Sequence, residues 1–220
     1  MKKFILLSLM ITFSLESLSD GNSIFSKNAP GLVFLMTDTG TASGVIISNK
    51  GYVLTNWHAI DGVDVHESSI GLHWAYDLGV YENYLVKFEV IKFDKTKDLA
   101  LLKIINPPKN LKAIKISKVI PPIGSESHAI GHPNGEIWTY TKGYISQHRN
   151  NYEWQYEENG IKHIADVYQT QTPITEGNSG GPLLNSHGNL IGINTFGSKK
   201  FQALNYAVGV NEIIKFISKT

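Results

Sequence analysis

One short segment of the sequence combines a nucleophile with glycines that allow a sharply bent backbone. Ser179 lies within the run Glu176-Gly177-Asn178-Ser179-Gly180-Gly181-Pro182. A serine that attacks a carbonyl group has to sit on a tight turn, with backbone N–H groups nearby that hold the developing oxyanion. The segment therefore indicates acyl-transfer chemistry, and a polar turn without a chemical role is the alternative interpretation.

The pattern Gly-x-Ser-x-Gly is also typical of the nucleophile elbow of α/β-hydrolases, but the surrounding sequence argues against that fold. The elbow needs a helix directly after the serine, and an acid followed by a histidine later in the chain. Pro182 would interrupt such a helix, no aspartate follows Ser179, and Glu212 comes after His187 rather than before it. Partners for the serine are therefore expected upstream.

Two residues upstream of Ser179 have the chemistry of a general base and of the acid that orients it. His58 follows the predicted strand 52–55, and Asp98 precedes the apolar run Leu99–Ile104, which begins another. A histidine can accept the serine proton, and a carboxylate can fix the tautomer of the imidazole. Asp94 is a rival for the second role. Asp98 is preferred because it stands at the mouth of a buried strand, whereas Asp94 belongs to a polar turn.

The order His58, Asp98 and Ser179, each in its own motif, resembles that of the trypsin-like serine proteases. Within that superfamily the chain is most similar to the bacterial HtrA-like branch. The segments that carry the resemblance are Thr55–Ile60, Asp98–Ile104, Ala129–Pro133, Gly177–Leu183 and Gly192–Thr195. The resemblance implies a serine endopeptidase without a cofactor, in which Ser179 attacks, His58 transfers the proton and Asp98 orients His58. It also implies an oxyanion hole formed by the backbone N–H groups of Gly177 and Ser179.

Departures from digestive trypsins bear on activation and specificity. Asn178 stands where those enzymes carry an aspartate that binds a new N-terminal ammonium group, so activation by cleavage to a free amino terminus is not expected. Pro173 stands where trypsin carries the charge that selects Lys or Arg. Asn194 stands where glutamate-selective relatives carry a histidine, and Glu176 near the entrance disfavours an acidic side chain. The resemblance therefore implies a small or medium apolar P1 residue, in a pocket formed by Pro173, Ile174, Glu176, Thr195, Phe196 and Gly197.

The elements that must position these residues are short β segments separated by Gly, Asn and Pro. The predicted strands are 32–36, 42–48, 52–55, 84–93, 100–104, 127–131, 137–146, 167–171, 182–184, 190–195 and 205–208. Pro107-Pro108 marks the best internal boundary. We predict an all-β, trypsin-like fold of two six-stranded antiparallel β-barrels, one over about 30–110 and one over about 111–210, closed by a helix over 211–218.

Composition limits the remaining chemistry. The chain has 220 residues, of which 42% are hydrophobic and 18% charged, and it has no cysteine. These values are typical of a globular domain with its own core, and they exclude thiol catalysis and thiolate metal sites. His128 and His132 are four residues apart, but in a predicted strand and turn without an accompanying acid, so no metal site is expected.

The first 19 residues read as an export signal rather than as part of the fold. Lys2 and Lys3 precede the uncharged run Phe4–Leu15, which is too short to span a membrane. We expect cleavage near Ser19 and a secreted or periplasmic bacterial protein; an uncleaved membrane anchor is the alternative. Without residues 1–19 the chain has 18 basic and 18 acidic residues, so a nucleic-acid partner is disfavoured.

Several features stay open at this point. HtrA-like chains carry PDZ domains after the protease domain, and the sequence predicts a protease unit without one, a protein or peptide substrate and an undetermined oligomeric state. The alternating Tyr152, Trp154 and Tyr156 could line substrate subsites or pack on the inner face of a strand. The aromatic stretch 71–84 has no assigned role. A catalytically silent binding or holdase protein is the rival function, and a secreted esterase is a weaker third.

Overall fold

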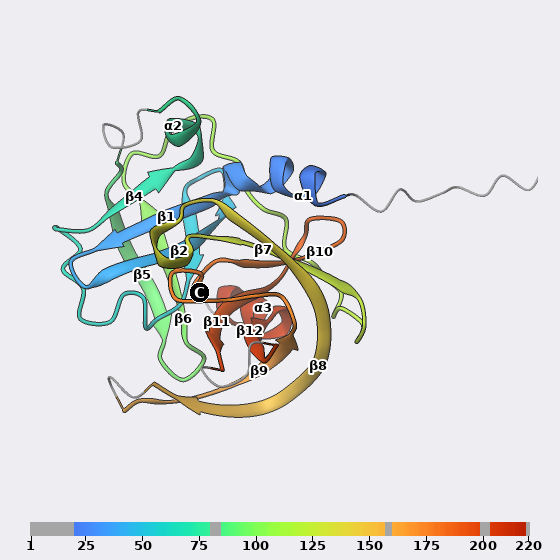
Figure 1. Cartoon of the computed structure of the whole chain (residues 1–220). Coiled ribbons are helices and arrows are strands. Elements are labelled where there is room, and N and C mark those ends of the chain that lie inside the picture. Colours follow the sequence, from blue (N-terminus) through green and yellow to red (C-terminus); the bar gives the residue numbers. More distant parts are fainter. Residues whose placement is uncertain (1–19, 80–84, 157–159, 199–202, 219–220) are drawn as a thin grey trace, which may run out of the picture.

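The structure, a computed structural model, describes residues 20–79, 85–156, 160–198 and 203–218 (Figure 1). The predicted export signal, residues 1–19, lies outside the described residues and stays a prediction. Among the described helices, none is both long and apolar enough to cross a membrane.

The first half of the chain forms a six-stranded antiparallel sheet. Its strands follow the order β4-β1-β2-β3-β6-β5. Two backbone hydrogen bonds between Ile70 of β4 and Val86, at 2.8 and 2.9 Å, join one edge of this sheet to the segment that leads into its other edge. The sheet therefore curls around its own apolar core. Its strands are β1 (Leu32–Thr37), β2 (Gly40–Ser48), β3 (Tyr52–Thr55), β4 (Ser69–Leu72), β5 (Phe88–Asp94) and β6 (Leu99–Ile104).

The second half forms a closed barrel in the order β10-β11-β12-β9-β8-β7. In Figure 1 the long strand β8 sweeps around the outside of this barrel, and helix α3 (Val210–Ser218) follows its last strand. Val210, Ile213 and Phe216 are the buried apolar residues of α3. The strands are β7 (Glu126–Gly131), β8 (Thr139–Gln155), β9 (Lys162–Thr170), β10 (Pro182–Asn185), β11 (Leu190–Gly197) and β12 (Asn205–Gly209).

The predicted fold class is confirmed: the structure is mostly β, with two six-stranded antiparallel sheets and a short C-terminal helix. Helix α1 (Gly21–Asn28) was not predicted; it begins at Asp20, whose carboxylate accepts a hydrogen bond from the backbone N–H of Ser23 at 2.8 Å. Strand β4, with a central glycine, and the short helix α2 (His73–Asp77) were also missed. Strand β8 runs to Gln155, whereas the predicted strand ended at 146. Two β-bulges keep the polar second half of the strand paired with β9.

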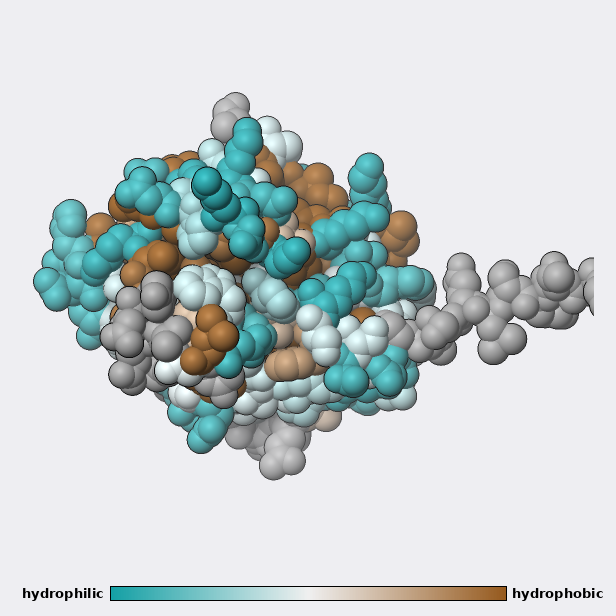
Figure 2. Space-filling model, turned by 90° about the horizontal axis from the view of Figure 1, so that it is seen from above, coloured by the Kyte–Doolittle hydropathy of each residue, from teal (hydrophilic) through white to brown (hydrophobic). Residues whose placement is uncertain are grey.

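The surface mixes hydrophilic and hydrophobic residues. Figure 2, which looks down on the end of the molecule that carries α1 and α2, shows hydrophobic residues set among hydrophilic ones. The large apolar side chains that are exposed are distributed over different elements, as Leu78, Phe93 and Val119 illustrate. Scattered exposure of this kind is normal for a folded domain and marks no particular partner.

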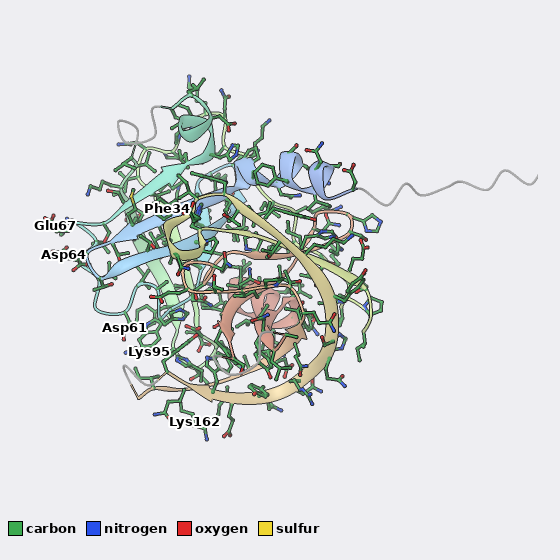
Figure 3. The ribbon with its side chains drawn as sticks, in the orientation of Figure 1. Phe34, Asp61, Asp64, Glu67, Lys95 and Lys162 are labelled. Atoms are coloured by element: carbon green, nitrogen blue, oxygen red, sulfur yellow. The ribbon has the colours of Figure 1, made fainter. Side chains whose placement is uncertain are left out.

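His132 is a buried histidine that joins the two sheets. Its Nε2–H donates to the backbone carbonyl of Val33 in β1 at 3.1 Å, and its Nδ1 accepts from the backbone N–H of Trp138 at 3.0 Å. Phe34, labelled in Figure 3, packs on the imidazole with the ring centroids 4.8 Å apart. Both ring nitrogens are thus used by a neutral imidazole, and burial lowers the pKa of His132 to about 3. His128 likewise uses its ring, through Nδ1, to contact the hydroxyl of Tyr140 at 2.7 Å.

We predict that the free energy of unfolding falls as the pH is lowered from about 6.5 towards 3. In that range the unfolded chain binds a proton at His132 that the folded chain does not, which costs up to about 1.4 kcal/mol per pH unit for this one group. Burial also lowers the pKa of His73 and of His128, which adds to the slope. Urea unfolding at several pH values should give a shallower slope for His132→Gln and an unchanged slope for His187→Gln, an exposed control. Equal slopes for both variants would contradict the assignment.

Candidate active site

The turn that carries Ser179 depends on glycine and is held by the first sheet. Gly177 and Gly180 have φ angles of +92° and +81°, which glycine adopts freely. A Cβ on Gly177 would overlap the carbonyl oxygen of His132. Ser43 of β2 donates its backbone N–H to the carbonyl of Ser179 and its hydroxyl to the carbonyl of Gly177, both at 2.8 Å. The turn belongs to the second barrel but is fastened to a strand of the first sheet.

Two backbone N–H groups of this turn are available to a ligand. Within the described part of the chain, the amides of Gly177 and Ser179 donate to no protein acceptor, whereas those of Asn178 and Gly180 donate to the carbonyls of Thr175 and Asn194. Such a pair of free donors beside a serine can bind an oxygen that develops negative charge.

His58 and Asp98 form a closely paired histidine and carboxylate. Nδ1 of His58 lies 2.8 Å from Oδ2 and 3.0 Å from Oδ1 of Asp98, and the backbone N–H of His58 donates to Oδ1 at 3.0 Å. Asp98 is fully buried, and its φ of +54° is a left-handed conformation that aspartate tolerates better than most residues. The side-chain amide of Asn56 supports this backbone by donating to the carbonyl of Asp98 at 2.9 Å.

The carboxylate of Asp98 stays ionised although it is buried. Burial by itself raises the pKa of Asp98. The neighbouring His58 and the hydrogen bonds from His58 and Thr195 outweigh this effect, so the net result is a pKa below the ordinary value. An ionised carboxylate at this position can hold the imidazole of His58 in one tautomer and stabilise its protonated form.

Thr195 connects the carboxylate to the serine. It lies at a β-bulge in β11, where the pairing with β12 shifts between Asn194 and Phe196. Its hydroxyl donates to Oδ2 of Asp98 at 2.6 Å, and its carbonyl accepts a hydrogen bond from Oγ of Ser179 at 3.1 Å. Among the hydrogen bonds of the described residues, none joins Ser179 to His58. The serine hydroxyl therefore rests against Thr195 beside the His58–Asp98 pair.

A pocket of about 620 Å³ opens beside Ser179 and His58. Of the residues predicted for the substrate pocket, Ile174, Glu176, Thr195, Phe196 and Gly197 line it. Pro173 is not among the lining residues; it is exposed, and its carbonyl accepts a hydrogen bond from the hydroxyl of Thr141 at 3.0 Å. Apart from Glu176, the lining carries no acidic side chain among the described residues.

The aromatic residues of the β8–β9 hairpin pack on the core, and two of them also line the pocket. Tyr152 stacks on Tyr206 and Phe196, with ring centroids 5.0 and 6.1 Å apart, and packs against the core. Trp154 and Tyr156 line the pocket; Trp154 is also a buried member of the core, and Tyr156 packs against it. The sequence left both roles open for all three, and the alternation of aromatic residues along a strand was the signal that could have found the two pocket residues.

The other residues weighed in the sequence have separate places. Asp94, the rival of Asp98, accepts a hydrogen bond from the backbone N–H of Lys97 at 3.0 Å and so closes the turn before Asp98. The side chain of Asn178 is buried against Gly131. Asn194 is buried and donates to the carbonyl of Pro182 at 3.1 Å. In the loop after His58, Asp61, Asp64 and Glu67 are exposed and lie on the left side of the molecule in Figure 3.

Comparison with known proteins gives a consistent set of matches. The model of the family described as "Trypsin-like peptidase domain" matches residues 42–193. Protease Do-like 1, chloroplastic, from Arabidopsis thaliana is 33% identical over 188 residues, covering 78% of this chain and 40% of its own length. Serine protease Do-like HtrA from Lactococcus lactis is 31% identical over 217 residues, covering 93% of this chain and 49% of its own length. The chain thus spans less than half the length of these two relatives.

A solved structure has the same fold. The crystal structure of the serine endoprotease from Yersinia pestis superposes with a TM-score of 0.72 at 29% identity, covering 91% of this chain and 66% of that one. The similarity includes both sheets, because so much of the chain is covered.

Gly177 and Gly62 offer a matched test of the turn. Both have positive φ angles, +92° and +70°, but a Cβ on Gly62 would meet nothing within 4 Å. We expect Gly62→Ala to lower the free energy of unfolding by about 1 kcal/mol, from the backbone conformation alone. Gly177→Ala should lower it by roughly 2 kcal/mol more, because its Cβ also meets the rigid carbonyl of His132. Urea titrations measure both values, and equal losses would show that the turn yields to the added methyl group.

Proposed function

The chain belongs to the trypsin-like peptidase domain family, and on that premise we propose that it is a serine endopeptidase acting on proteins or peptides. The family inferred from three sequence motifs and the one found by comparison are the same. The observation that carries the proposal is that the His58–Asp98 pair, the hydroxyl of Ser179 and the free backbone amides of the serine turn lie together, with His58 and Ser179 lining one pocket.

The proposed reaction begins with attack of Ser179 Oγ on the carbonyl carbon of a peptide bond. The serine proton passes to Nε2 of His58, and the carbonyl electron pair moves onto oxygen, which the amides of Gly177 and Ser179 bind. The C–N bond then breaks, and the leaving amine takes the proton from His58. Water repeats the sequence on the acyl-enzyme, releasing the acid and regenerating Ser179.

Asp98 contributes by keeping Nδ1–H of His58 as a donor, which leaves Nε2 unprotonated and able to accept the serine proton. The hydroxyl of Ser179 starts from its hydrogen bond with the carbonyl of Thr195. Rotation about the Cα–Cβ bond of Ser179 is the step that turns the hydroxyl towards His58. Hydrogen bonds in catalytic sites commonly tighten only when substrate is bound.

A catalytically silent binding or holdase protein is the second candidate. The observation that favours it is the resting contact of Ser179 with Thr195 instead of His58. In such a protein the pocket would hold an apolar segment of a client, and the serine hydroxyl would remain an unactivated alcohol.

Reactivity of Ser179 separates the two candidates. We expect a fluorophosphonate probe to label the wild-type chain, since an activated serine attacks phosphorus as it attacks a carbonyl. Ser179→Ala should abolish labelling and lower peptide turnover by on the order of a thousandfold or more. Ser26→Ala, which removes an exposed hydroxyl on α1, serves as the control and should behave as wild type. Absence of labelling in the wild-type chain would favour the binding protein.

The pocket lining supports a preference for an uncharged P1 residue. Ile174, Phe196 and Gly197 give it an apolar wall, and Glu176 repels an acidic side chain. For a basic P1 side chain, Glu176 is the one acidic partner in the described lining. It is exposed to water and therefore forms a weak ion pair. In a peptide library we expect cleavage after small or medium apolar residues. A strong preference for Arg at P1 would contradict this specificity while leaving the reaction itself intact.

A further inference from the structure

We propose that Tyr156 is a positioning residue for the His58–Asp98 pair, supplied by the β8–β9 hairpin of the second barrel. The inference rests on the proposed function and deepens it. Nothing in the motifs of the sequence pointed to this role, because Tyr156 lies 58 residues from Asp98 along the chain.

The hydroxyl of Tyr156 lies within hydrogen-bond distance of Thr195, which holds Ser179, and of Asp98, which holds His58. It is 2.9 Å from Oγ1 of Thr195, 3.2 Å from Oδ2 of Asp98 and 3.2 Å from the carbonyl oxygen of Thr195. Its single proton can reach Oδ2 directly or through the hydroxyl of Thr195, which itself donates to Oδ2 at 2.6 Å. By the direct route Tyr156 adds a donor to Oδ2, the carboxylate oxygen that lies 2.8 Å from Nδ1 of His58. Through Thr195 it strengthens the hydrogen bond that Thr195 already donates to that oxygen.

The ring of Tyr156 supports the histidine as well. It lies tilted on the imidazole of His58, with the ring centroids 4.5 Å apart and the planes at 48°. The phenol thus contacts both members of the pair at once, Asp98 through its hydroxyl and His58 through its ring. A movement of the hairpin would disturb the two contacts together.

The hairpin is pinned to the turn that precedes Asp98. The backbone N–H of Ile164 in β9 donates to the carbonyl of Thr96 at 2.8 Å, and Nδ1–H of His163 donates to the carbonyl of Lys95 at 2.6 Å. The imidazole of His163 stacks on Trp154 with the centroids 5.3 Å apart. Lys95 and Lys162 accordingly lie at the same lower end of the molecule in Figure 3. These contacts therefore hold the hairpin in a fixed position relative to the carboxylate of Asp98.

The physical effect follows from burial. A buried carboxylate is stabilised by each hydrogen-bond donor that replaces water. Each additional donor also weakens the attraction of the carboxylate for the proton of the neighbouring imidazole. Burial, and next the charge of Asp98, raise the pKa of Tyr156, so the phenol remains a donor at neutral pH. The other charged or titratable groups nearby are His163 beside the Tyr156 ring, Lys95 with its ammonium 5.0 Å from the Trp57 ring centroid, and Glu176 in the pocket lining.

The test removes the hydroxyl and keeps the ring. With a peptide substrate, Tyr156→Phe should lower kcat about fivefold, the size expected for one lost hydrogen bond, and leave KM nearly unchanged. The acid limb of the pH profile should move to higher pH, because Asp98 with one donor fewer holds the imidazolium proton more strongly. Tyr152→Phe is the matched control: it removes a phenol hydroxyl from β8, shortly before Tyr156, where the ring stacks on Phe196 and Tyr206, and it should keep the wild-type kcat and pH profile.

A measurement without turnover separates this role from the proposed function. In Ser179→Ala, the NMR resonance of the proton between Nδ1 of His58 and Asp98 should shift when Tyr156→Phe is added and stay in place when Tyr152→Phe is added. An unchanged resonance with Tyr156→Phe would overturn the inference, as would equal loss of kcat in both phenylalanine variants. If the wild-type chain cleaves no peptide, the proposed function fails, while the resonance still decides whether Tyr156 positions the pair.

Discussion

The ionised carboxylate of Asp98, buried without access to water, is the constraint on which the site depends. Burying a charge is costly unless hydrogen bonds replace its hydration. Here the donors come from separate parts of the chain: His58 after β3, Thr195 at a bulge in β11 and Tyr156 beyond the end of β8. One donor belongs to the first sheet and two to the second barrel. The two halves must therefore dock accurately for the charge to be tolerated at all.

A second set of contacts fixes the serine turn across the same boundary. Ser43 of β2 holds the carbonyls of Gly177 and Ser179, while His132, at the end of β7, reaches back to Val33 of β1. The serine turn is thus built from second-barrel sequence but shaped by first-sheet atoms. The arrangement explains why the turn needs glycines with positive φ. The turn packs between the first sheet and the second barrel, and a side chain on Gly177 or Gly180 would overlap backbone atoms of His132 or Ser43.

The sequence was sufficient to predict features that are local or periodic along the chain. It was insufficient for features that depend on the curvature of the sheets. Alternating apolar segments and turns predicted the two sheets and α3. Motifs around His58, Asp98 and Ser179 indicated residues that the structure does bring together, with His58 and Ser179 in the pocket lining and Asp98 buried against His58, although their catalytic roles remain predictions. The bulge that aims Thr195 at Asp98, and the bend of β8 that carries Tyr156 across the molecule, arise from sheet geometry and leave no local pattern. Helix α1 was not predicted because it is short, and the capping residue Asp20 is the only sequence signal for it.

The contact between Ser43 and Gly177 joins residues 134 positions apart in the chain. Closing a loop of that length costs chain entropy that one hydrogen bond does not offset, so the contact depends on the surrounding structure. A chain made from its amino terminus has His58 and Asp98 long before it has Ser179, and Thr195 later still. The site is therefore complete only when both halves of the chain have folded and docked. A partly folded or nascent molecule has no formed site with which to attack its neighbours.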